Sequence, residues 1–149
     1  MYHRIGKGGS KYWGRAGAGI FFTDGKKVLL LKRSEKGDNS GTWGIPGGKA
    51  EKNETVFGTA TRESKEECGI VKGKRFNSFE TIDGLHRWTT FLFLTEPFRC
   101  KLSDEHTDWK WIDFNELKYY NLHPKLEDQI DRYIKAVKNV SFKEMINIS

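Results

Sequence analysis

Residues 47–70, GGKAEKNETVFGTATRESKEECGI, place a group of glutamates behind a pair of glycines in a chain whose net charge is +6. Glu63, Glu66 and Glu67 are spaced i, i+3 and i+4, so on a helix their carboxylates project from one side. Carboxylates this close repel one another unless cations neutralise them, and their hard oxygens are ligands that Mg²⁺ and Mn²⁺ prefer. The spacing therefore indicates a divalent-metal site, with a solvated charged helix face as the alternative.

The same segment predicts a helix over residues 54–68. The helix is expected to begin near Asn53 or Thr55 and to end at Gly69, which supplies a C-terminal stop. Small or apolar residues recur every four positions and predict its buried stripe, which comprises Val56, Ala60, Ser64 and Cys68.

The rest of the chain predicts strands interspersed with a second long helix. The strand-forming runs are residues 19–33, interpreted as a hairpin, and then 42–48, 88–96 and 108–114. Asp24-Gly25 predicts a two-residue turn within the hairpin. Pro124 suits the first turn of the last helix, whose apolar face comprises Leu126, Ile130, Ile134 and Val137. This pattern predicts an α+β fold, with a sheet sandwiched between helices.

Length and composition favour one globular domain that works inside the cell. The 149 residues include 36% hydrophobic and 13% aromatic residues, which argues against disorder. No run approaches the ~20 apolar residues of a membrane span, and the N-terminus lacks the apolar core of a signal peptide. Cys68 and Cys100 predict two free thiols in a reducing cytoplasm. The basic balance suits either an anionic partner or ordinary solubility.

The order and spacing of the acids carry a family resemblance. The pattern G-x5-E-x7-R-E-U-x-E-E-x-G-U is met, except at its first U position, by Gly48, Glu54, Arg62, Glu63, Glu66, Glu67, Gly69 and Ile70. This segment resembles the Nudix box, and the chain is similar to MutT-like single-domain Nudix hydrolases. Ser64 departs from the pattern, which has a bulky aliphatic residue there, so we expect looser packing or a contribution from Phe57.

The resemblance implies the Nudix fold, a mixed sheet sandwiched between helices, over residues 17–138. A Gly-rich arm would precede it at 1–16 and a tail would follow at 139–149. It also implies metal-dependent hydrolysis of a diphosphate linkage in a nucleoside di- or triphosphate or a nucleoside diphosphate derivative, with water as the nucleophile.

The resemblance further implies a set of site residues. The metal ligands for Mg²⁺ or Mn²⁺ would be the Gly48 carbonyl, Glu63, Glu66 and Glu67. Catalytic roles fall to these three glutamates, Arg62 and Glu105, with Glu63 and Glu105 both open as the general base. Substrate phosphate would meet Gly47, Gly48, Arg33 and Lys49. Arg62 is expected to pair with Glu66 or to reach back to Glu54.

The substrate is less defined than the chemistry. In this family, enzymes that act on ADP-ribose often carry a proline in the region of residues 83–87, and those that act on dinucleoside polyphosphates carry a tyrosine there. This chain has neither residue in that region. Asn121 lies one position from the place that oxidised-purine recognition would need. Aromatic residues that could stack on a base are Trp13, Trp88, Tyr119 and Tyr120. His86, His106 and His123 are interpreted as surface or capping groups, and no His/Cys cluster supports zinc.

Three functional hypotheses follow. A small nucleotide is the expected partner, because the positive charge is spread along the chain rather than gathered in one tract. The alternatives are an RNA 5′-end hydrolase and a non-catalytic nucleotide-binding module of the same fold. No membrane partner is expected, and both a monomer and a homodimer are compatible with the sequence.

Overall fold

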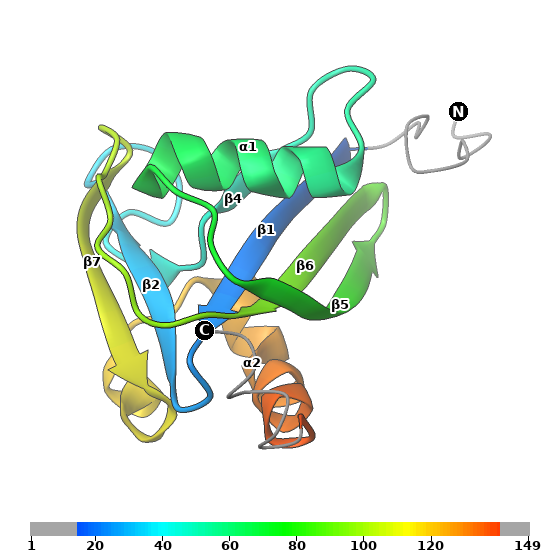
Figure 1. The fold of residues 1–149 in the computed structure, drawn as a ribbon. Coiled ribbons are helices and arrows are strands. Elements are labelled where there is room, and N and C mark those ends of the chain that lie inside the picture. The colour runs from blue at the N-terminus through cyan, green and yellow to red at the C-terminus, as the bar shows by residue number, and fades with distance from the viewer. Residues whose placement is uncertain (1–14, 141–149) are drawn as a thin grey trace.

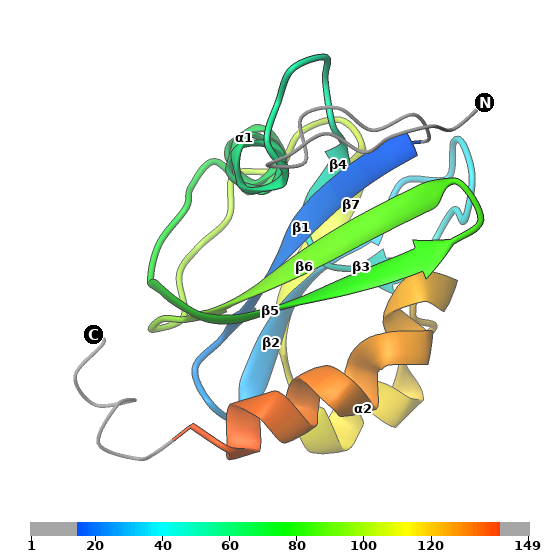
Figure 2. The ribbon, with the colours of Figure 1, turned by 90° about the vertical axis from the view of Figure 1, so that its right-hand side faces the viewer.

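A seven-stranded sheet lies between two helices in the computed structural model, which describes residues 15–140 (Figure 1, Figure 2). The elements are β1 (Arg15–Thr23), β2 (Lys27–Arg33), β3 (Trp43–Gly44), β4 (Gly47–Lys49), α1 (Val56–Cys68), β5 (Lys74–Asp83), β6 (His86–Leu94), β7 (His106–Asp113), the 3₁₀ helix η2 (Phe114–Tyr119) and α2 (Pro124–Lys138). The main strands follow the order β3-β2-β1-β6-β5, with β4 also beside β1 and β7 beside β2. The β1–β6 pair is parallel and the others are antiparallel, so the predicted α+β fold with a mixed sheet is confirmed.

Most of the predicted N-terminal arm and C-terminal tail, residues 1–14 and 141–149, lies outside the described residues. Within 15–140, no helix is long and apolar enough to cross a membrane.

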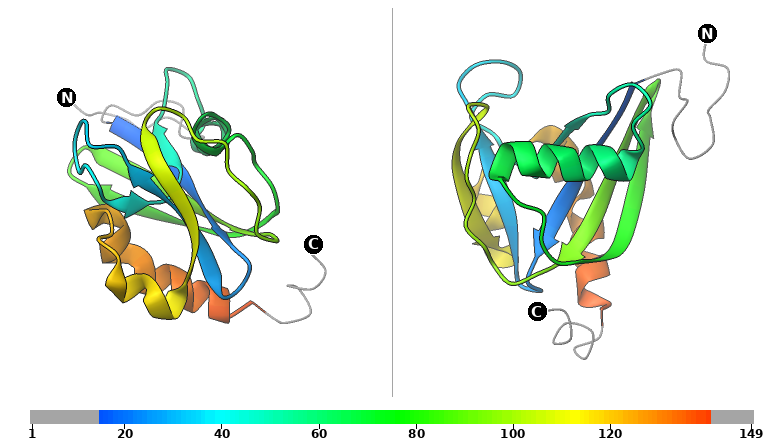
Figure 3. Two further views of the ribbon diagram at one scale, coloured as in Figure 1. Left: turned by 90° about the vertical axis from the view of Figure 1, so that its left-hand side faces the viewer. Right: turned by 45° about the horizontal axis from the view of Figure 1, so that its top comes forward.

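The central strand, β1, is buried on both faces from Gly17 to Thr23. Its side chains alternate between two hydrophobic cores, as the two-residue period of a strand requires. Phe21 packs into the core that contains residues of α2, while Ile20 and Phe22 pack into the core beneath α1. Figure 3 shows α1 lying across one face of the sheet. Because helices cover both faces, β1 has a nearly continuous apolar sequence.

The predicted hairpin of residues 19–33 is only partly correct. β1 and β2 are antiparallel, but their only paired register position is Thr23 with Val28, next to the turn. The turn spans three residues rather than two, because the Asp24 carboxylate accepts hydrogen bonds from the backbone N–H groups of Lys26 and Lys27 at 2.9 and 2.8 Å. Beyond it β1 pairs with β4 and β6, and β2 pairs with β3 and β7.

The Gly-Ala-Gly sequence of β1 explains how β4 lies against it. A Cβ atom on Gly17 would lie 2.8 Å from the Gly48 carbonyl oxygen, and one on Gly19 would lie 2.6 Å from the Pro46 carbonyl oxygen. Both distances are too short for any larger side chain, so the two glycines admit the segment that leads into the acidic helix.

The acidic helix forms as α1 with the predicted caps. The Thr55 hydroxyl accepts a hydrogen bond from the Gly58 backbone N–H at 3.0 Å, and Gly69 takes a left-handed conformation with φ of 81°. Ser64 is fully buried, and its hydroxyl donates a 2.6 Å hydrogen bond to the Ile70 carbonyl. That bond satisfies the buried hydroxyl in place of aliphatic packing, while Phe57 stays 40% exposed.

A fifth main strand, β5, was not predicted. It is an edge strand that pairs with β6 through a two-residue turn, Gly84-Leu85. The two-residue alternation breaks at an irregularity between Arg75 and Asn77, so its apolar residues Phe76 and Phe79 stand three positions apart. Residues 83–87, considered above as a substrate-reading segment, form this hairpin end.

The last helix begins at Pro124 as predicted. Its N-cap is His123, whose Nδ1 accepts a hydrogen bond from the Lys125 backbone N–H at 3.2 Å, so the predicted capping role of this histidine is confirmed. The residues of α2 that pack on the sheet are Leu126, Ile130, Tyr133, Ile134 and Val137.

Candidate active site

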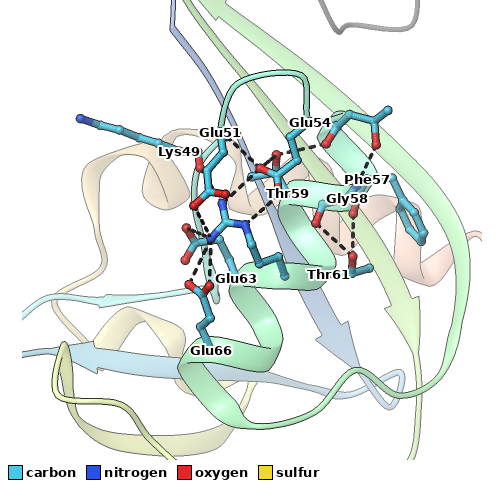
Figure 4. Close-up of polar contacts among 11 residues, drawn as sticks. Lys49, Glu51, Glu54, Phe57, Gly58, Thr59, Thr61, Glu63 and Glu66 are labelled. Carbon is cyan, nitrogen blue, oxygen red and sulfur yellow. Dashed lines mark hydrogen bonds and ion pairs between the residues drawn. The ribbon is translucent and has the colours of Figure 1, made fainter.

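Arg62 pairs with several acids of α1 and the loop before it, among them Glu54, Glu63 and Glu66, which are labelled in Figure 4. Its Nε donates to Glu54 at 2.7 Å, and its Nη1 contacts Glu66 at 3.1 Å and Glu63 at 3.3 Å. Its Nη2 donates to the Lys49 backbone carbonyl at 3.0 Å. Both pairings expected from the sequence are therefore present at once. One guanidinium thus links four carboxylates to β4, the fourth being Glu51 at 3.7 Å, and it holds the pKa of Glu54 at about 2.

The three glutamates that the Nudix-like pattern places on α1 lie at different depths. Glu67 is only 5% exposed, and its Oε1 accepts a 2.8 Å hydrogen bond from the Gly47 backbone N–H. Burial raises the pKa of Glu67 to about 9. Burial also raises the pKa of Glu63, although Arg62 opposes the shift, whereas Glu66 is exposed. The side of α1 that carries these acids thus runs from solvent into the protein.

The glycine pair allows the acids to approach β4. A Cβ atom on Gly48 would lie 2.4 Å from Glu63 Oε2, and one on Gly47 would lie 2.6 Å from the Ala18 carbonyl oxygen. Any larger residue at either position would displace a neighbour. The two glycines therefore let Glu63 and the backbone of β1 come close to β4.

Glu105 joins the acids from the loop before β7. Ligand-capable atoms of Glu67, Glu105 and His106 all lie within 4.8 Å of one another. Asp104 and Asp108, the competing acids nearby in sequence, are exposed and belong to no such cluster within residues 15–140. The structure therefore brings Glu105 to the helix that carries the other predicted site acids.

The interpretation of His106 as a surface or capping group is wrong. His106 is 8% exposed, and its Nδ1 has no hydrogen-bond partner among the residues that the structure describes. Burial lowers the pKa of His106 to about 4, so the ring is neutral at physiological pH. His86, in contrast, is exposed as predicted. The sequence signal for His106 was its position directly after Glu105 at the start of an apolar strand.

These residues fit a divalent cation. Glu67 and Glu105 offer hard oxygen donors, and a ring nitrogen of His106 is a further donor in the same cluster. A cation would also favour the ionised form of Glu67, which burial alone disfavours.

A cavity of about 160 Å³ adjoins the acids between the sheet and α2. Its lining combines basic, aromatic and small residues: Arg33, Gly44, Ile45, Gly47, Gly48, Trp88, Thr90, His106, His123, Lys125, Leu126 and Tyr133. No acidic side chain belongs to this lining within the described part of the chain. The cavity therefore suits an anionic ligand that reaches the acids through Gly47, Gly48 and His106.

The two predicted phosphate-binding cations differ in position. Arg33 lines the cavity, and its Nε donates to the Asp38 backbone carbonyl at 3.1 Å. Lys49 is exposed, is absent from the lining, and extends its side chain away from the acids in Figure 4. Its backbone carbonyl contributes instead, as an acceptor for Arg62.

Only one of the aromatic residues considered for base stacking lines the cavity in the described part of the chain. Trp88 does so, and its Nε1 donates to the Thr90 hydroxyl at 2.8 Å. Tyr119 is 76% exposed, Tyr120 packs edge-on against Trp43, and Trp13 lies outside the described residues.

Asn121, one position from the place that oxidised-purine recognition would need, is also absent from the lining. Asn121 is exposed, and His123 and Lys125 line this side of the cavity instead. The Lys125 Nζ lies 5.9 Å from the centre of the Trp88 ring, within the range of a cation–π contact.

Comparisons with known proteins agree with the fold and the acidic helix. Residues 13–136 match the family model described as NUDIX domain. A putative 8-oxo-dGTP diphosphatase 3 from Mycobacterium tuberculosis is 32% identical over 137 residues, covering 80% of this chain and 62% of the relative. The chain thus spans less than two thirds of that relative's length.

A viral relative and a solved structure extend the comparison. The mRNA-decapping protein g5R of African swine fever virus is 33% identical over 72 residues, covering 48% of this chain and 27% of the viral protein. The crystal structure of RenU, a Nudix hydrolase from M. smegmatis, superposes with a TM-score of 0.71 at 21% identity, covering 93% of this chain and 95% of RenU. The chain belongs to the Nudix hydrolase family.

Proposed function

We propose that this chain uses Mg²⁺ or Mn²⁺ to hydrolyse a diphosphate linkage in a small nucleotide, either a nucleoside di- or triphosphate or a nucleoside diphosphate derivative. The observation that carries the proposal is the convergence of Glu67, Glu105 and His106 beside a cavity whose charged lining is basic. The acids suit the metal, and the cavity suits the anionic nucleotide.

The protein groups divide into ligands and positioning residues. A bound divalent metal would neutralise phosphate charge and lower the pKa of an attacking water. Glu63, Glu66 and Glu67 would hold it, together with the Gly48 carbonyl. Arg62 positions two of these acids through its 3.1 and 3.3 Å contacts, and the Gly47 N–H fixes the third at 2.8 Å.

Two carboxylates remain candidates for accepting the proton of the water. Burial raises the pKa of Glu63, which strengthens it as a proton acceptor. Glu105 is exposed and close to Glu67, so it can exchange a proton with solvent. Comparing Glu63→Gln with Glu105→Gln separates them, because loss of the general base should flatten the acidic limb of the kcat–pH profile, where protonation of that base lowers the rate.

Arg33 and Lys125 would bind the nucleotide from the cavity. Both are cationic lining residues, so they can meet phosphate oxygens that no metal neutralises. Trp88 offers a ring face to a base. The absence of Asn121 from the lining argues against the oxidised-purine reading that the name of the mycobacterial relative suggests.

A small nucleotide suits the cavity better than RNA. A space of about 160 Å³ holds one base rather than a strand. The decapping activity in the name of the viral relative keeps an RNA 5′ end as the alternative, supported over only 48% of this chain. RNA tracking the basic surface would show an affinity loss of about 10³ or more between low and moderate salt, whereas a mononucleotide would show a shallow slope.

The test is a metal-dependent turnover panel. Purified protein is incubated with dGTP, 8-oxo-dGTP, ADP-ribose, a dinucleoside polyphosphate and 5′-triphosphorylated RNA, and products are identified by chromatography across a salt range. We expect a mononucleotide to give the highest kcat/KM, with no turnover in chelator. Better turnover of RNA with a steep salt slope would favour the decapping alternative, and binding without turnover of any substrate would favour the non-catalytic module.

A further inference from the structure

His106 is a buried donor that the Nudix-like pattern does not use. It is the first residue of β7, it is 8% exposed, and its Nδ1 is unpartnered within residues 15–140. A buried imidazole nitrogen without a partner is unfavourable, so native proteins rarely keep one without a ligand or water. A partner for this nitrogen, a ligand or a water, is therefore expected.

The backbone around His106 orients its side chain toward the acids. His106 pairs with Arg33 while Asp108 pairs with Lys32, so Thr107 is an extra residue in β7 at this point. Such bulges redirect side chains and recur beside functional sites. The preceding residue is held as well, because the Glu105 carbonyl accepts a 3.0 Å hydrogen bond from the Ser34 N–H.

We propose that Glu67, Glu105 and His106 form a mixed oxygen–nitrogen site for a first-row transition-metal divalent ion such as Mn²⁺, with a His106 ring nitrogen as a ligand. The proposal rests on the proposed metal-dependent function but adds a ligand to the all-oxygen set that the box supplies. Its chemistry follows from the donors, since imidazole favours transition metals whereas Mg²⁺ prefers oxygen.

The distances allow this coordination after a contraction of the cluster. The donor atoms of the three residues lie within 4.8 Å of one another. Three donors at ~2.1 Å from one ion are at most ~3.6 Å apart when equally spaced, so separations up to 4.8 Å would need to close by about 1 Å. Glu105 is exposed and can make that movement, while the Gly47 N–H holds Glu67 in place.

The decisive measurement is electron spin-echo envelope modulation of Mn²⁺ bound to the full-length protein, which detects nitrogen nuclei coordinated to the metal. We expect ¹⁴N modulation in the wild type, replaced by the ¹⁵N pattern when histidine alone is labelled with ¹⁵N. His106→Gln should abolish the modulation and weaken Mn²⁺ binding at least about 10-fold, the minimum cost of losing even an outer-shell partner. Its Mg²⁺ affinity should change less than about threefold, because oxygen ligands remain.

The control uses the other histidines of the chain. A variant carrying His3→Gln, His86→Gln and His123→Gln leaves His106 as the sole histidine and should keep both the modulation and the Mn²⁺ affinity. This variant also decides the question if His106→Gln fails to fold. Mn²⁺ binding without histidine modulation in the wild type, or modulation that disappears in the triple variant, overturns the proposal.

The outcome separates this proposal from the proposed function. Turnover with Mn²⁺ but without nitrogen modulation would leave the hydrolase proposal standing and remove His106 from the metal site. Nitrogen modulation without turnover of any nucleotide would keep His106 as a metal ligand and remove the hydrolase proposal.

Discussion

Replacing Glu67 with Gln should stabilise the metal-free protein while removing most of its activity. The side chain is 5% exposed, and its Oε1 accepts the Gly47 N–H at 2.8 Å. Glutamine has nearly the same shape and can keep this acceptor, but it carries no charge. The substitution therefore isolates the effect of a buried negative charge.

The sign and size of the stability change follow from the raised pKa. The pKa of Glu67 rises from 4.5 to about 9, so the folded state binds the proton more tightly and stability falls as pH rises across that window. At about pH 7.5, roughly three pH units into the window, the penalty approaches ~4 kcal/mol as an upper bound. Glutamine carries no charge and avoids this penalty, so Glu67→Gln should raise the free energy of unfolding by ~2–4 kcal/mol. That gain corresponds to a rise in Tm of about 6–12 °C. Near pH 4.5 the difference should nearly vanish.

The assay combines thermal melting in chelator at pH 5 and 7.5 with phosphate release in Mg²⁺. Turnover should fall by at least on the order of 10²-fold, the effect of losing a strong electrostatic stabiliser. Glu127→Gln, an exposed residue in the first turn of α2, is the matched control and should change little. A lower Tm for Glu67→Gln in chelator at pH 7.5, or activity within threefold of wild type, would refute the reasoning.

Three further predictions test the neighbouring contacts. Gly48→Ala should lower the metal affinity measured by calorimetry on the order of 10-fold. The reason is that the new Cβ would lie 2.4 Å from Glu63 Oε2. Unchanged affinity would contradict the role of Gly48 in close approach. In steady-state kinetics, Arg33→Ala should raise KM at least about 10-fold, whereas Lys49→Ala should change KM less than about threefold. Of these two residues, only Arg33 lines the cavity. Equal effects on KM would contradict that distinction. Excess chelator should stop turnover and Mg²⁺ or Mn²⁺ should restore it, whereas full activity in chelator would rule out metal dependence.

Local sequence signals predicted the acidic helix well because its determinants are short-range. Thr55 and Gly69 act within one turn of the helix ends, and the i, i+3, i+4 spacing of the acids sets their side of the helix. Arg62 was correctly paired with both Glu54 and Glu66. The depth of each acid was not predictable from this pattern, because burial depends on which strand packs beside the helix.

The features that sequence reasoning missed arise from long-range pairing. His106 faces the site only because Thr107 is an extra residue opposite β2, and a bulge of this kind leaves no periodic signal. β5 escaped prediction because a second irregularity at Arg75–Asn77 breaks its alternation. The hairpin was overextended because β4 and β6, distant in sequence, compete with β2 for the edges of β1.

The central strand and the site share one structural requirement, which is close backbone approach. Gly17 and Gly19 admit β4 beside β1, and β4 in turn brings Gly48 within contact of Glu63. Glycine within a strand costs about 0.5–1 kcal/mol relative to alanine, so these residues weaken β1 while they allow the site to form. The buried apolar run that follows, from Ile20 to Phe22, supplies the burial that offsets this cost. The geometry of the acids is thus built into the most buried strand of the fold, which keeps it fixed before any ligand binds.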